Sequence, residues 1–181
     1  MPEEEISFKD KSSFLFDVIK RYDHYIATTN FKVGLLMSFA GAIVLGLTIR
    51  VVLLGSPESS CDHLYYAAVF SSLLTISLSL AAIISLLRVV FPNTTTCANY
   101  KSIVFFGDVF ATPNGAEGYA KNVEEATPEE LLKDLSKQTY VIAGVVNEKF
   151  RLLKIAVKIF IYGVIPALAV SILLLISNGG G

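Results

Sequence analysis

The chain has little charge and few residues that could bind a metal. Charged residues make up 17% of its 181 residues, whereas an average soluble domain has roughly 25%. The formal net charge is −1, which argues against a partner of uniform charge such as duplex DNA. Two cysteines and two histidines are present, with no CxxC or HExxH spacing. We therefore expect no metal site and no cofactor.

Signatures of catalysis and secretion are missing as well. The sequence has no Walker loop, no GxGxxG motif, no paired carboxylates and no histidine placed to activate a serine. We therefore expect that the protein is not an enzyme. The N-terminus reads Met-Pro-Glu-Glu-Glu, which is acidic where a signal peptide needs positive charge. The first apolar segment is thus expected to stay in the protein as a membrane anchor.

Long apolar runs are what the sequence does have. Hydrophobic residues make up 53% of the chain. Three runs of about 20 residues are each long enough to cross a hydrocarbon core of roughly 30 Å. They are residues 33–54, 64–87 and 155–176. We predict an all-α membrane protein with three transmembrane helices. The alternative is a soluble all-α protein with buried helices, which three such runs in so short a chain disfavour.

The distribution of lysine and arginine predicts the orientation of these spans. Basic residues precede the first run and lie between the second and third, whereas the 55–63 loop and the 177–181 tail have none. The positive-inside rule then places the N-terminus and residues 88–154 in the cytoplasm, and the loop and the C-terminal tail outside. Cys61 and Cys97 would lie on opposite sides of the membrane and could not pair within one chain. An intersubunit bond through Cys61 and an unpaired Cys61 both stay open.

The cytoplasmic part is predicted to be small and mostly helical. Residues 1–31 contain an amphipathic helix that should run close to, or into, the first span. Residues 93–127 are expected to be irregular, with an apolar stretch, 102–111, too short to form a helix. A capping box with proline at the first helical position starts a long helix at Pro128, which should continue to about Ile176.

Small and hydroxyl side chains repeat every four residues within the spans, and such stripes let helices approach closely in lipid. The residues are Gly34, Ser38, Ala42 and Gly46 with Arg50 in line, then Ser71, Thr75 and Ser79, then Gly163, Ala167 and Ser171, with a kink expected at Gly163 and Pro166. The small-residue stripes fit packing within the chain or a homo-oligomer. The hydroxyl stripe fits packing or a water-lined pore. Arg50 either reaches the headgroups or forms a basic ring that favours anions.

Three short motifs stand at the cytoplasmic ends of the spans. They are Asn30-Phe31-Lys32, Phe105-Phe106-Gly107-Asp108 and Asn147-Glu148-Lys149-Phe150. Their arrangement resembles the Pycsar-effector family of small bacterial membrane proteins, found in anti-phage defence operons beside nucleotide-synthesising enzymes. The resemblance covers roughly residues 12–176. Asn30 stands where the family has the aspartate of an Asp-x-Lys motif.

The resemblance implies an oligomeric effector or ion channel in the bacterial inner membrane. A nucleotide or oligonucleotide from a neighbouring nucleotidyltransferase or cyclase would shift it to a pore-forming state that permeabilises or depolarises the membrane, causing abortive infection. The reverse logic, in which the nucleotide restrains the channel, stays open. The alternative function is a non-conducting membrane scaffold that recruits a cytoplasmic protein partner through residues 93–150.

A nucleotide would be expected to bind close to the inner face of the lipid bilayer. The candidate ligand-binding residues are Lys32, Phe105, Asp108, Lys149, Arg151 and Lys154. The basic residues could meet phosphates or, alternatively, anionic lipid. Phe105 and Phe106 could stack a base or pack inside the protein, and Asp108 could pair with Lys149 or Lys32.

Overall fold

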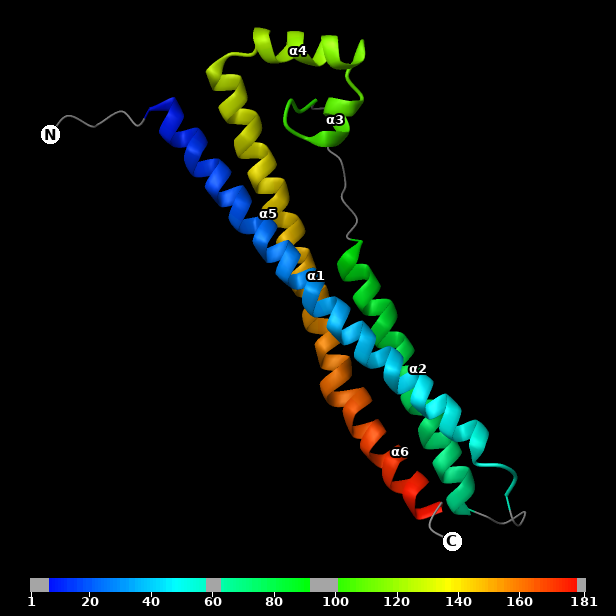
Figure 1. Ribbon diagram of the computed structural model, residues 1–181. Coiled ribbons are helices and arrows are strands. Elements are labelled where there is room, and N and C mark those ends of the chain that lie inside the picture. Colours follow the sequence, from blue (N-terminus) through cyan, green and yellow to red (C-terminus); the bar gives the residue numbers. More distant parts are fainter. Residues whose placement is uncertain (1–6, 58–62, 92–100, 179–181) are drawn as a thin grey trace, which may run out of the picture. The chain divides into compact units, whose positions relative to one another are not determined.

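The computed structural model describes residues 7–57, 63–91 and 101–178, and all regular structure in these ranges is helical (Figure 1). The helices are α1 (Phe8–Leu53), α2 (His63–Val90), α3 (Phe106–Phe110), α4 (Gly115–Glu125), α5 (Pro128–Ile159), the π-helical turn η1 (Phe160–Val164) and α6 (Ile165–Asn178). Three helices are long and apolar enough to cross a membrane, namely Phe8–Leu53, His63–Val90 and Pro128–Asn178. The predicted all-α fold with three candidate spans is therefore confirmed. Cys61 and Cys97 lie outside the described residues.

Two of the helices extend well beyond the predicted spans. α1 is uninterrupted for 46 residues, so the amphipathic segment and the first apolar run form one helix. α5 begins at Pro128, where the capping box lies. Thr127 N donates to Glu130 Oε2 at 2.9 Å, and Glu130 N donates to Thr127 Oγ1 at 3.2 Å. These reciprocal bonds satisfy donors that a helix start leaves unpaired.

A π-helical turn lies where the kink at Gly163 and Pro166 was expected. The N–H of Ile165 donates to the carbonyl of Phe160, five residues earlier. Pro166 follows directly and has no N–H, so the carbonyl of Tyr162 cannot receive the usual i→i−4 bond. A wider turn just before a proline relieves this mismatch, and π turns are a common cause of helix bending.

The region between the second and third spans is more helical than predicted. Residues 106–110 and 115–125 form α3 and α4, so the expectation of an irregular segment was wrong for these residues. Asn114 and Gly115 have φ values of +63° and +59°, and this left-handed turn, which Asn and Gly tolerate, separates the two helices. α4 has apolar residues at helical spacing, from Ala116 to Val123, but its two glycines and the preceding Pro-Asn-Gly turn favoured an irregular segment.

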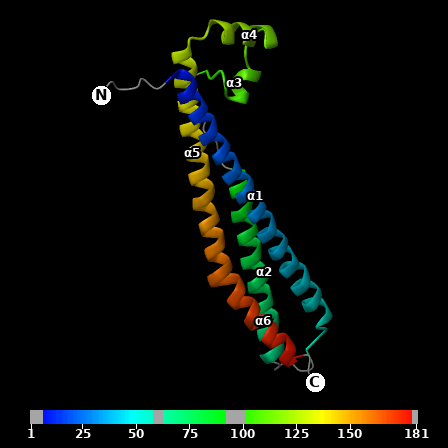
Figure 2. The ribbon, with the colours of Figure 1, turned by 60° about the vertical axis from the view of Figure 1, so that its left-hand side comes forward.

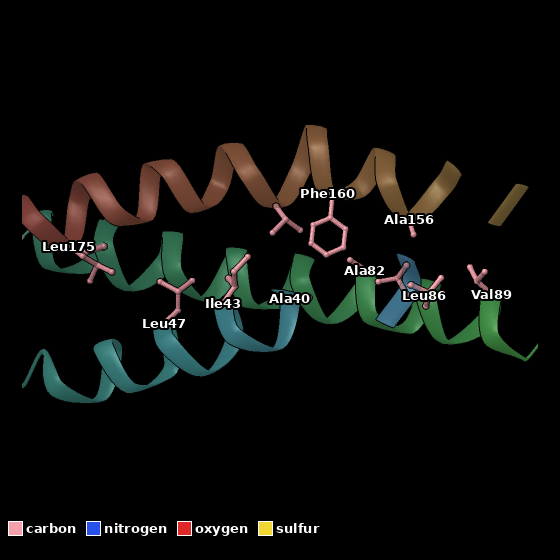
Figure 3. Packing of buried hydrophobic residues seen from close by; sticks show 12 residues of the cluster. Ala40, Ile43, Leu47, Ala82, Leu86, Val89, Ala156, Phe160 and Leu175 are labelled. Atoms are coloured by element: carbon pink, nitrogen blue, oxygen red, sulfur yellow. The ribbon is translucent and has the colours of Figure 1, made fainter. Parts of the chain in front are cut away.

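The chain divides into two compact units. The first unit comprises residues 1–27 and 93–147, and the second comprises residues 28–92 and 148–181. In the second unit α2 packs closely against α6, and the two lie side by side in both ribbon views (Figures 1 and 2). Its buried apolar cluster, shown in Figure 3, is Val33, Ala40, Ile43, Leu47, Ala68, Ala82, Leu86, Val89, Ala156, Phe160, Val164 and Leu175.

Candidate functional site

Lys149 joins three helices of the second unit. Its side chain is only 4% exposed. Its ammonium donates to the carbonyls of Val89 at 2.7 Å and Val90 at 3.3 Å, and to Asn30 Oδ1 at 3.0 Å. Val90 is the last residue of α2, so the ammonium satisfies carbonyls that the helix end leaves unpaired and carries positive charge where a helix end favours it. Lys149 on α5 thus holds α1 and the end of α2.

The same contacts limit what Lys149 can bind. An ammonium has three N–H donors, and here each has an acceptor in the chain. Burial lowers the pKa of Lys149, because the charged form loses hydration. The residue precedes the predicted span 155–176. In this conformation Lys149 has no N–H left for a phosphate, and we interpret it as a structural residue.

The other basic candidates near the predicted inner face lie on the surface. Arg151 donates to both carboxylate oxygens of Glu148, at 2.7 Å from Nε and 2.6 Å from Nη2. Such a two-point contact occupies the guanidinium fork. Lys32 and Lys154 are exposed. These two lysines remain open to lipid headgroups or to a ligand.

In the first unit, one carboxylate holds the loop before α3. Asp134 of α5 is 1% exposed. Its Oδ2 accepts from Ser102 Oγ at 3.0 Å, from Ile103 N at 2.7 Å and from Val104 N at 3.2 Å. Asp108 Oδ2 accepts from Ser102 N at 2.9 Å. The 102–105 loop is therefore tied both to α5 and to α3.

The paired phenylalanines sit at the end of this loop. The rings of Phe105 and Phe106 are 4.8 Å apart and tilted by 50°, and Phe106 is 79% exposed. A Cβ on Gly107 would lie 2.8 Å from Cε1 of Phe105. The glycine of the Phe-Phe-Gly-Asp motif therefore leaves room for the Phe105 ring.

A cavity of about 700 Å³ lies in the first unit, beside the loop that Asp134 holds. Its polar lining includes Lys101, Ser102, Asp108, Tyr119, Asn122 and Lys133. Asp108 was a candidate from its motif, but the other five were not. They come from a loop, α4 and the first turns of α5, so only the folding of residues 101–133 brings them together.

The hydroxyl stripe of the second span lies between α2 and α6. Ser71, Thr75 and Ser79 are buried. Ser171 Oγ lies 2.8 Å from Ser71 Oγ and 2.8 Å from Thr75 Oγ1, and Ser79 Oγ donates to the Thr75 carbonyl at 2.8 Å. Their polar groups are thus satisfied inside the second unit, as a low-dielectric environment requires.

The third-span stripe packs in the same interface, at least in part. A Cβ on Gly163 would lie 3.7 Å from a methyl group of Leu78 on α2. Gly163 and Ala167 are half-buried and Ser171 is fully buried. Pro166, by contrast, is exposed. The stripes of the second and third spans therefore face each other within one chain.

The small-residue stripe of the first span is left uncovered. Gly34, Ser38, Ala42, Gly46 and Arg50 are all exposed, whereas the buried face of α1 is formed by Val33, Ala40, Ile43 and Leu47. A Cβ on Gly34 or Gly46 would meet nothing within 4 Å. Packing within the chain therefore does not explain this stripe.

The comparisons with known proteins agree with the motifs. The sequence profile of the Pycsar effector protein domain matches residues 14–176. The chain belongs to the Pycsar effector family. A relative in Escherichia coli, the Pycsar effector protein EcPycTM, is 30% identical over 151 residues, which is 78% of this chain and 78% of the relative. No solved structure gives a significant match. This Pycsar-family chain is thus an anti-phage defence effector and a membrane protein.

Asn30 is the motif residue of this Pycsar-family chain that contacts Lys149. It stands where the resemblance leads us to expect an aspartate, and its Oδ1 accepts a hydrogen bond from Lys149. The ammonium already makes this a charge-assisted bond, and an aspartate at the same place would turn it into a salt bridge. Asp108 belongs to the first unit and Lys149 to the second, and the predicted pairing of Asp108 with Lys149 or Lys32 stays a prediction.

Proposed function

We propose that this Pycsar-family effector forms a homo-oligomeric pore in the bacterial inner membrane, gated by a nucleotide that a neighbouring cyclase or nucleotidyltransferase makes. The N-terminus and residues 88–154 would lie in the cytoplasm, with the C-terminus outside. Opening would depolarise the membrane and stop growth of the infected cell. The chain itself would carry out no catalysis.

The uncovered stripe on α1 is the observation that supports an oligomer. In lipid no hydrophobic effect drives helices together, and close backbone contact across small residues supplies much of the attraction. The stripes of α2 and α6 are already used within the chain. The α1 stripe is exposed, and no described residue lies within 4 Å of a Cβ on Gly34 or Gly46. A second copy of the chain can supply a packing partner.

The same face suggests which helix would line a pathway. Ser71, Thr75 and Ser79 are buried between α2 and α6, so they cannot line a pore without separating these helices. Arg50 is exposed in line with the α1 stripe. Around a pathway, one Arg50 from each subunit would form a ring of positive charge, which favours anions.

Enlarging the α1 stripe should abolish depolarisation. We expect a membrane-potential dye to report depolarisation when the wild-type chain is expressed with its cyclase. The double variant Gly34→Leu, Gly46→Leu should lose this signal and run as a monomer in nanodiscs, because bulky side chains prevent close helix contact. Ser77→Leu makes a similar change at an exposed position of α2 and should retain the signal.

Two results would count against this function. A flat dye signal with and without the cyclase, while the wild-type protein is present in the membrane, would contradict the pore. A stoichiometric cytoplasmic protein that copurifies with a non-conducting wild-type chain would support the scaffold instead.

A further inference from the structure

The cavity of the first unit has the size and composition of a ligand site. Its volume of about 700 Å³ falls in the range of roughly 300–1,000 Å³ typical of small-molecule pockets. Its walls come from the loop at Lys101–Ile103, from α3 and the turn that follows it, from α4 and from the start of α5. Polar groups from separate segments that meet in one hollow can fix the orientation of a ligand.

The acidic groups of the cavity already have partners. Asp108 accepts from Ser102 N, and Glu125 lies 3.7 Å from the ammonium of Lys121. Glu130 accepts from Thr127 N and Oγ1, and these bonds lower the pKa of Glu130. Asp108 and Glu130 are therefore hydrogen-bonded to donors of the chain itself, whereas Glu125 has only an exposed ion pair.

The basic groups of the cavity are Lys101 and Lys133. Lys101 precedes the Asp134-bound loop, and Lys133 lies on α5, where its charge acts on Glu130. Both side chains are exposed and can move to an incoming anion. Two ammonium groups from different segments can bind a phosphate as point charges.

The neutral groups add recognition of a planar ring. Tyr119 contributes an aromatic side chain whose hydroxyl donates to the carbonyl of Ile103 at 3.1 Å, which fixes it against the loop. Asn122 contributes an amide that both donates and accepts. Aromatic rings stack bases and amides read their polar edges.

We propose that this cavity is the nucleotide site of the effector, with the phosphate at Lys101 and Lys133 and the base at Tyr119 and Asn122. This inference rests on the proposed function, because it names the site through which the nucleotide would act. It moves the ligand away from the basic residues at the predicted inner face, among which Lys149 has no free donor.

The cavity also has a direct connection to a helix that enters the second unit. Ser102 and Ile103 line the cavity, and both donate to the carboxylate of Asp134 on α5. α5 runs from Pro128 to Ile159 without a break. A ligand that rearranges the loop would therefore act on the helix that carries Lys149.

Equilibrium binding to the full chain in nanodiscs tests the site. The probes are a panel of 3′,5′-cyclic nucleoside monophosphates. We expect Lys101→Gln with Lys133→Gln to weaken binding by about tenfold or more, the loss expected from removing charge-assisted contacts. Lys32→Gln with Lys154→Gln removes the same charge at the predicted membrane face and should change binding by less than about twofold. Asn122→Ala should reduce the difference in affinity among the bases.

The outcomes separate the site from the function. Binding that survives the cavity double variant but is lost in the Lys32, Lys154 variant would overturn the cavity and leave the proposed function intact. A wild-type chain that binds no probe, yet depolarises cells when its cyclase is expressed, would also overturn this site. A wild-type chain that shows neither binding nor depolarisation would overturn both the site and the proposed function. Circular dichroism of each variant would verify that the helices are retained.

Discussion

Replacing Lys149 with methionine is expected to lower the free energy of unfolding of the second unit by about 3 kcal/mol. Methionine has a similar length but no donor. The carbonyls of Val89 and Val90 and the amide oxygen of Asn30 would each lose a hydrogen bond. The loss falls short of three full desolvation penalties, because the contact with Val90, at 3.3 Å, is long for a hydrogen bond.

Thermal unfolding of the nanodisc-embedded chain, followed by circular dichroism, measures this effect. Lys154→Met is the matched control, because Lys154 lies on the same helix but is exposed, and its effect should stay within about 0.5 kcal/mol. Asn30→Asp should be tolerated within about 1 kcal/mol, since it supplies Lys149 with a carboxylate. Equal midpoints for the Lys149 and Lys154 variants would show that the three-helix contact contributes nothing to stability.

Replacing Asp134 with leucine is expected to cost about 3–4 kcal/mol and to release the 102–105 loop. Three donors would lose their common acceptor. They are the hydroxyl of Ser102 and the amides of Ile103 and Val104. Asp134→Asn should cost much less, about 1 kcal/mol, because its amide oxygen can still accept at the Oδ2 position. The aspartate Oδ1 is buried and has no hydrogen-bond partner among the described residues, so the amide nitrogen of asparagine would gain no acceptor there.

Hydrogen exchange of the loop amides distinguishes these variants. Ile103 and Val104 should exchange rapidly in Asp134→Leu and stay partly protected in Asp134→Asn. Amides of α2 should be unchanged, because α2 belongs to the second unit. Ser136→Ala, at an exposed position of the same helix, is the control. If Ile103 and Val104 exchanged as slowly in Asp134→Leu as in the wild type, Asp134 would not hold the loop.

The parts of the fold that the sequence predicts are those with a local cause. Apolar runs of about 20 residues indicate the spans because lipid requires them. The start at Pro128 follows from a capping box whose hydrogen bonds join residues three apart. A departure from regular helix near Gly163 was expected from Pro166, which lacks an N–H donor, but its π form was not. α4 was missed although its few apolar residues recur at helical spacing, because two glycines within it and the turn before it weaken that signal.

The contacts of Asp134 and Lys149 were predicted less well, because they join residues that are distant in sequence. Asp134 binds residues about 30 positions earlier, and no local pattern encodes that distance. A signal was present, since an aspartate between Leu131 and Leu135 interrupts the apolar face of a helix. Lys149 was recognised from its motif, but the carbonyls of α2 that it binds carry no signature in the side-chain sequence.

The π turn at Phe160–Val164 gives the two long helices different torsional properties. α1 keeps the i→i−4 pattern throughout its 46 residues, so twisting one end about its axis must turn the other end by a similar angle. The helix that starts at Pro128 contains five π-helical residues before α6, where the hydrogen-bond register already departs from i→i−4. Rotation of α5 can therefore be taken up at this turn, leaving α6 in its contact with α2, while rotation of α1 reorients Gly34, Gly46 and Arg50 together.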